Sequence, residues 1–161
     1  MKRLLIIVAA LAAGLVGCAS GGGTEVNGAT ILQTGPHSAV KDQGTREVHD
    51  QAALEALWKE TYATASSPPD MPTVDFTKQT VVALFLGAKK HGGFRLTVAR
   101  AEPSASVPNS FDVDFAVILP GDNCRNTTQD ITYPYIIAVV PAGPDQHISF
   151  DHEERQTPPC T

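Results

Sequence analysis

The sequence predicts an α+β fold, mainly β, with an antiparallel sheet or sandwich of about six strands and one packed N-terminal helix. Two uninterrupted apolar runs, at residues 80–86 and 135–140, are typical of strands that are buried on both faces. Strict alternation at residues 94–98 and 111–115 is typical of strands with one solvated face. A single stretch, residues 50–62, repeats its apolar residues at helical spacing.

The N-terminus resembles a secretory leader. Lys2 and Arg3 precede an apolar or glycine run over residues 4–16, which is too short for a membrane-spanning helix of about 20 residues. We therefore expect residues 1–17 to be a cleaved lipoprotein signal peptide.

The leader ends in Leu15-Val16-Gly17-Cys18, which resembles the lipobox of bacterial lipoproteins. This resemblance implies that Cys18 carries lipid, with acyl chains such as palmitate, and holds the chain to a membrane outside the cytoplasm. Ala19 in the next position indicates an outer membrane facing the periplasm if the cell is Gram-negative. The alternative is an ordinary signal peptide with a cysteine near its cleavage site.

The chain that follows the leader is predicted to have two parts. Residues 18–28 are mostly glycine, small or polar, as in a flexible tether, and residues 29–161 are long enough for one globular domain. From Cys18 onward, 10 Lys and Arg oppose 17 Asp and Glu, giving a formal charge of −7. This acidity disfavours sequence-independent binding to nucleic acid.

The remaining elements follow in order along the domain. Short strands or a hairpin are expected at residues 30–32 and 46–48. Asp50 can cap a helix whose apolar stripe contains Trp58, which we assign to the core. The four strands named above come next, and residues 147–150 are a short last strand.

Two cysteines remain after lipidation of Cys18. Cys124 and Cys160 are an even number in an oxidising compartment, so a disulfide between them is expected. In the chain-entropy view such a bridge stabilises the fold by about 3–4 kcal/mol. Two free thiols are the alternative.

Several segments together resemble the PrcB family, whose name comes from a lipoprotein subunit of a bacterial surface protease complex. They are Trp58, Val74-Asp75-Phe76, residues 81–87, Gly92-Gly93-Phe94 and residues 133–137. The likeness extends over residues 31–150 and implies a single PrcB-like domain over residues 29–161. It also implies a non-catalytic accessory subunit that binds other envelope proteins, among them a protease.

Seven residues are candidates for binding a partner through an aromatic contact surface. They are His91, Gly92, Gly93, Phe94, Tyr133, Pro134 and Tyr135. The alternative for the glycine pair is a turn that requires glycine for its backbone conformation. The Gly92-Gly93-Phe94 loop also weakly resembles chagasin-type protease inhibitors, which insert loops into a protease cleft.

No catalytic motif occurs in the sequence, so we expect neither an enzyme nor a bound metal or cofactor. Asp112 and Asp114 fall on one side of an alternating strand, where two solvated acids are the commoner arrangement than a carboxylate pair. Residues 151–154 are expected to be a solvated charge run in a turn. An enzyme whose catalytic residues are scattered along the chain remains the alternative.

Overall fold

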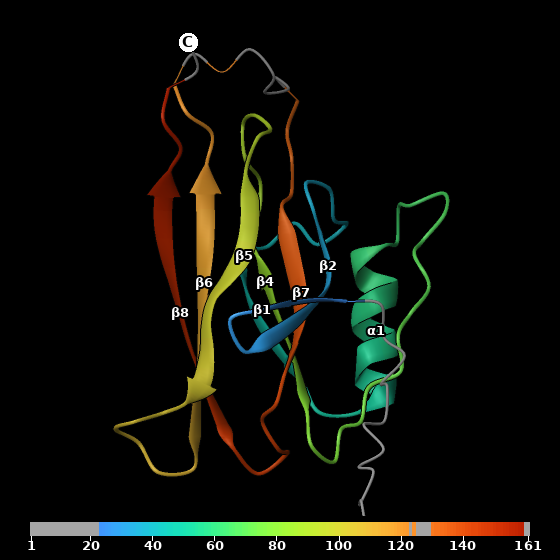
Figure 1. Ribbon diagram of the computed structural model, residues 1–161. Coiled ribbons are helices and arrows are strands. Elements are labelled where there is room, and N and C mark those ends of the chain that lie inside the picture. Colours follow the sequence, from blue (N-terminus) through green and yellow to red (C-terminus); the bar gives the residue numbers. More distant parts are fainter. Residues whose placement is uncertain (1–22, 123, 125–129, 160–161) are drawn as a thin grey trace, which may run out of the picture.

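The computed structural model describes residues 23–122, 124 and 130–159, which form two β-sheets and one helix in three layers (Figure 1). The five-stranded sheet has the order β1-β2-β7-β4-β3, and the three-stranded sheet has the order β5-β6-β8. The strands are β1 Thr24–Val26, β2 Ala29–Gly35, β3 Gly44–Val48, β4 Thr80–Phe85, β5 Arg95–Pro103, β6 Ser110–Leu119, β7 Tyr135–Val140 and β8 His147–Gln156. The helix, α1, spans Gln51–Thr61. The predicted fold class is confirmed, with more strands than expected.

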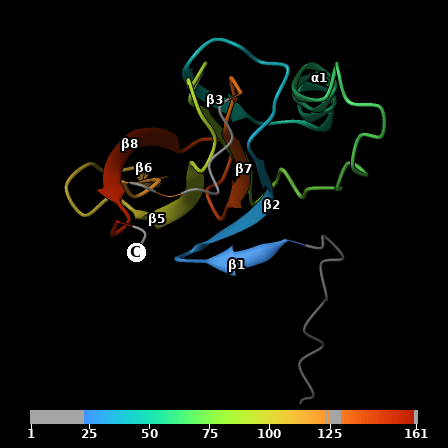
Figure 2. The ribbon, with the colours of Figure 1, turned by 90° about the horizontal axis from the view of Figure 1, so that it is seen from above.

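The five-stranded sheet is the middle layer, and its central strands β4 and β7 are buried on both faces (Figure 2). In β4, Val82 and Leu84 point into the core between the two sheets, whereas Val81, Ala83 and Phe85 point into the core beneath α1. An uninterrupted apolar run is therefore needed, because every position of the strand faces one of two apolar layers.

Helix α1 begins where the sequence predicts. The Asp50 carboxylate accepts a hydrogen bond from the Ala53 backbone N–H at 2.7 Å, which satisfies a donor that the first helical turn leaves open. Leu54, Leu57 and Trp58 are buried against the five-stranded sheet. The Trp58 indole donates to the Pro69 carbonyl oxygen at 2.9 Å, so its assignment to the core is confirmed.

One pair of strands in the three-stranded sheet is not antiparallel as expected. Strand β5 pairs antiparallel with β6, but β8 pairs parallel with β6 along its whole length. Strand β8 also continues to Gln156, so the turn predicted at residues 151–154 is wrong and these residues are extended. Their side chains are exposed, and pairing of the main chain with β6 gives the segment its strand conformation.

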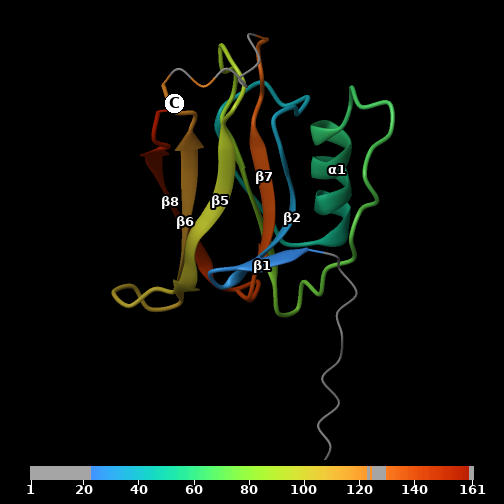
Figure 3. The same ribbon diagram turned by 45° about the horizontal axis from the view of Figure 1, so that its top comes forward.

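The folded part of the chain begins earlier than the sequence indicates. Strand β1 forms a hairpin with β2 inside the segment that was predicted as tether, and Asn27 and Gly28 have φ of 47° and 84° at its turn. Asn27 fixes the hairpin to β5, since its side-chain amide donates to Val98 O at 2.9 Å and its carbonyl accepts from Ala101 N at 2.9 Å (Figure 3). The expected tether is therefore shorter at its C-terminal end.

The predicted leader and the lipidation site Cys18 lie outside the described residues. Among the residues that are described, no helix is long and apolar enough to cross a membrane.

Candidate functional site

The candidate contact surface lies at one end of the sandwich, where the loop between β4 and β5 meets the segment leading into β7. The Lys89 N–H donates to Thr132 O at 2.8 Å, and the Thr132 N–H donates to Lys89 O at 3.0 Å. The Thr132 hydroxyl also donates to the His91 carbonyl oxygen at 3.1 Å. These bonds join two loops that lie about forty residues apart in sequence, so the structure brings the two halves of the predicted surface together.

Two aromatic rings stack on the β4–β5 loop. The His91 and Phe94 rings lie 5.2 Å apart with an interplanar angle of 21°, and the Lys89 Nζ lies 5.8 Å from the Phe94 ring centroid. Phe94 is half-buried against the core between the sheets. Gly93 has φ of 91°, a conformation that favours glycine, so the turn requires glycine at this position. The loop therefore holds its rings in a defined place.

Tyr133 and Pro134 are joined to neighbouring segments through their backbones. The Tyr133 N–H donates to Pro36 O at 2.8 Å, and its carbonyl accepts from Ser38 N at 3.0 Å. Pro134 is buried, and its carbonyl accepts from Leu86 N at 3.0 Å. Tyr133 is half-buried and retains access to solvent.

Tyr135 does not belong to the exposed part of this surface. Its side chain is only 5% exposed and points into the core beneath α1, because alternation along β7 sends this residue to the helix side of the sheet. Its hydroxyl lies 2.8 Å from the Tyr62 hydroxyl, in a hydrogen bond that either group can donate. The Tyr135 ring also stacks with Phe85. The prediction that Tyr135 belongs to the contact surface is therefore wrong.

Burial sets the ionisation of this tyrosine pair. Removal from water raises the pKa of Tyr62 far above its ordinary value, and the hydrogen bond and charge of Tyr135 raise it further. Burial also raises the pKa of Tyr135. Both hydroxyls therefore stay neutral at physiological pH and act as a structural link between α1 and β7.

One exposed residue of this end was missed by the sequence interpretation. Ile131 is 60% exposed, more than Val107 or Met71, the other exposed large apolar residues of the described chain. It directly precedes the buried Thr132 that joins the loops. No periodicity marks it, because it lies in a connection between strands. We call the set Lys89, His91, Phe94, Ile131 and Tyr133 the loop-end surface.

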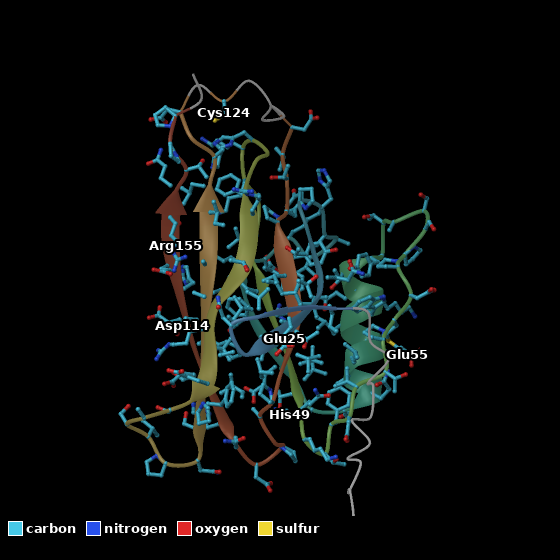
Figure 4. All side chains as sticks on the ribbon, in the orientation of Figure 1. Glu25, His49, Glu55, Asp114, Cys124 and Arg155 are labelled. Carbon is cyan, nitrogen blue, oxygen red and sulfur yellow. The ribbon has the colours of Figure 1, made fainter. Side chains whose placement is uncertain are left out.

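The C-terminal segment returns to the same end of the molecule. The Thr157 N–H and hydroxyl both donate to the Leu119 carbonyl oxygen, at 3.1 and 2.9 Å. Gly121 lies so close to the chain that a Cβ there would be 2.1 Å from the Pro158 oxygen. Cys124 follows shortly after in the same loop (Figure 4). Cys160 lies outside the described residues, so its bridge to Cys124 stays a prediction.

The predicted solvated acids lie on the outer face of the three-stranded sheet. Asp114 and Asp112 alternate with the buried Val113, and Asp114 Oδ2 forms an ion pair with Arg100 Nε at 2.8 Å. Arg100 also contacts Glu102 at 3.0 Å. Across the described parts of the chain, no group of three or more His, Cys, Asp or Glu residues is arranged to hold a metal ion.

Comparison with known proteins identifies one family. The family described as PrcB C-terminal matches residues 80–141. No curated protein and no solved structure matches the chain. The match is narrower than the predicted likeness over residues 31–150, and it holds strands β4 to β7 together with all seven predicted contact residues. Over residues 80–141, the chain is thus similar to the PrcB family.

Proposed function

We propose that this protein is a lipid-anchored accessory subunit of the cell envelope that binds a protease complex at the surface or in the periplasm through its loop-end surface. The observation that carries the proposal is the family match, which covers both loops that form this surface. The PrcB family is associated with accessory subunits of protease complexes. The proposal assigns no catalytic residue, metal or cofactor to the chain.

The contacts of the loop-end surface support a binding role. Aromatic and exposed apolar side chains are common anchors at protein interfaces when the backbone that presents them is fixed. The paired backbone of Lys89 and Thr132 joins the loop that holds the stacked His91 and Phe94 rings to the loop that holds the exposed Ile131. A partner bound here would cover an apolar side chain that the fold leaves in water.

The lipid anchor is the second part of the proposal. Cys18 precedes Gly23, the first described residue, by five positions. Five extended residues span at most about 17 Å, so an anchored domain would stay close to its membrane. A partner that meets it there would belong to the same envelope compartment.

Site-specific photo-crosslinking tests the proposal. We would place benzoylphenylalanine at Ile131 in the full chain and, as a matched control, at Val107, which is 53% exposed in the distant β5–β6 hairpin. The expected result is a crosslink from Ile131 to a protease or a subunit of a protease complex, with none from Val107. Equal capture from the two positions, or capture of unrelated proteins only, would contradict the proposal.

A protease inhibitor is the second candidate function, favoured by the ordered Gly92-Gly93-Phe94 loop with its glycine-dependent turn. In that case the domain would inhibit cysteine proteases directly, and Phe94→Ala would remove the inhibition. A titration against a papain-type protease decides this. Absence of inhibition at micromolar concentration would eliminate the candidate.

A further inference from the structure

Strand β8 leaves one edge of the three-stranded sheet open. Among the described residues, its only neighbour in that sheet is β6, and it lies at the outside of the sandwich in Figures 1 and 2. His147 N donates to Asn109 O at 3.0 Å, and Thr157 N donates to Leu119 O at 3.1 Å, so the odd-numbered residues at both ends direct their N–H groups toward β6. Because successive residues of a strand alternate, the even-numbered residues direct theirs to the open edge. There the His152 N–H donates to the Asp151 carboxylate at 2.7 Å.

The outer half of β8 is exposed on both faces. From Asp151 to Gln156 every side chain is exposed, with odd-numbered residues on the outer face of the sheet and even-numbered residues on the inner face. Glu153 pairs with Arg155. Asp151 and Glu154 have no ion pair with any described residue, so one unneutralised carboxylate lies on each face of the strand.

A cavity of about 280 Å³ opens on the outer face beside these residues. Its walls are formed by Ala99, Arg100, Asp114, Asp151, His152, Glu153 and Arg155. Asp114 and Asp151 are opposite each other in the register of β6 and β8, where like charges repel. Arg100 pairs with Asp114 and Arg155 pairs with Glu153, which leaves Asp151 as the carboxylate of the cavity without an ion pair to a described residue. The cavity thus offers room and charge for a basic side chain.

The same charges disfavour a second copy of this chain at the edge. Two β8 strands that pair antiparallel would match even-numbered residues with even-numbered ones. At the centre of such a pair, one residue lies opposite its own counterpart in the other copy. When the central residue is any of residues 151 to 154, Asp151, Glu153 or Glu154 lies opposite an acid of the other copy, which is destabilising. Charged residues on an edge strand commonly block such self-pairing.

We propose that the edge of β8 from Phe150 to Gln156 binds an extended segment of a partner protein that carries Lys or Arg at alternating positions. Backbone hydrogen bonds to Phe150, His152 and Glu154 add this segment to the sheet as a fourth strand, and the His152 N–H passes from the Asp151 carboxylate to a carbonyl of the segment. Its basic side chains reach Asp151 and the cavity on the outer face. The inference does not rest on the loop-end surface.

A peptide pair tests this inference on the full chain in detergent. The probe is a fluorescein-labelled ten-residue peptide of alternating Lys and Thr, and its control has Glu in place of every Lys. We expect fluorescence anisotropy to detect binding of the Lys peptide only, weakened by added salt. When the Lys peptide binds, the backbone amides of residues 150, 152 and 154 should become more protected from hydrogen exchange. Binding without protection of these amides, or no binding, would overturn the inference.

Two variants separate charge from strand addition. D151N should weaken the Lys peptide about threefold, as expected for the loss of one exposed charge contact on the face that carries the Lys side chains. The control D70N removes the same charge elsewhere and should leave binding unchanged. His152→Pro removes an N–H at the open edge and should abolish binding with the circular dichroism spectrum retained. Equal affinity in D151N and its control D70N would refute the role of the Asp151 carboxylate.

Discussion

At the scale of single residues, the hydroxyl pair of Tyr62 and Tyr135 shows where a sequence pattern misleads. A Pro-Tyr step before an apolar strand indicated an exposed ring, yet Tyr135 is buried and its hydroxyl bonds to a residue 73 positions away. No local pattern reveals a partner at that distance. By contrast, the buried place of Trp58 follows from helical spacing alone.

Tyr135→Phe tests the energetic role of this bond. The change leaves the Tyr62 hydroxyl buried without its partner, which costs about 1–3 kcal/mol of unfolding free energy. Urea denaturation followed by Trp58 fluorescence measures the loss. The double variant with Tyr62→Phe removes both polar groups and should be more stable than the sum of the single changes predicts. Strict additivity would argue against the pair acting as a unit.

At the scale of elements, the strands and the helix that were predicted well can be recognised from their own residues. The apolar runs of β4 and β7 face two apolar layers, and α1 has an N-cap and an apolar stripe. Strand β1 and the outer half of β8 were missed because their side chains are largely exposed. Their conformation comes from pairing with β2 and β6, which is information held elsewhere in the chain.

The start of α1 gives a prediction at this scale. Asp50→Ala removes the acceptor for the Ala53 N–H and should lower the unfolding free energy by about 1 kcal/mol. Asp50→Asn keeps an acceptor and should restore most of that stability. Thermal unfolding monitored by circular dichroism compares the two variants. Equal loss in both would show that the cap contributes little.

At the scale of the whole molecule, the candidate site was predicted in part. The loop that carries His91 and Phe94 is joined to the segment that leads to Tyr133 as expected, but Ile131 was missed and Tyr135 is buried. Sequence spacing places residues on strands. It does not tell which loops meet, since that depends on how β4 and β7 pair in the middle layer.

The proposed bridge from Cys124 to Cys160 gives a prediction for the whole fold. Replacing either cysteine by serine should lower the unfolding free energy by about 3–4 kcal/mol, because the closed loop no longer restricts the unfolded chain. Reduction of the wild-type protein should reproduce the loss, and the double serine variant should be insensitive to reductant. Persistence of full stability in reductant would exclude the bridge.

The proposed anchor is tested by fractionation. Cys18→Ser removes the acceptor for lipid, so the protein should move from the membrane fraction to the soluble fraction. Retention of the variant in membranes that have been washed with high salt would refute lipidation as the main attachment. Far-UV circular dichroism of the released protein should match that of the wild type.

The early start of β1 changes how the proposed anchor would act. With Thr24 already held in the sheet, only a few residues separate the proposed anchor at Cys18 from the fold. The domain would then diffuse within a thin layer along the bilayer instead of sampling the full depth of its compartment. Encounters with other membrane-bound proteins would become two-dimensional, and a weak contact would gain a high effective concentration. Modest affinity at the proposed loop-end surface would then be enough for a well-populated complex.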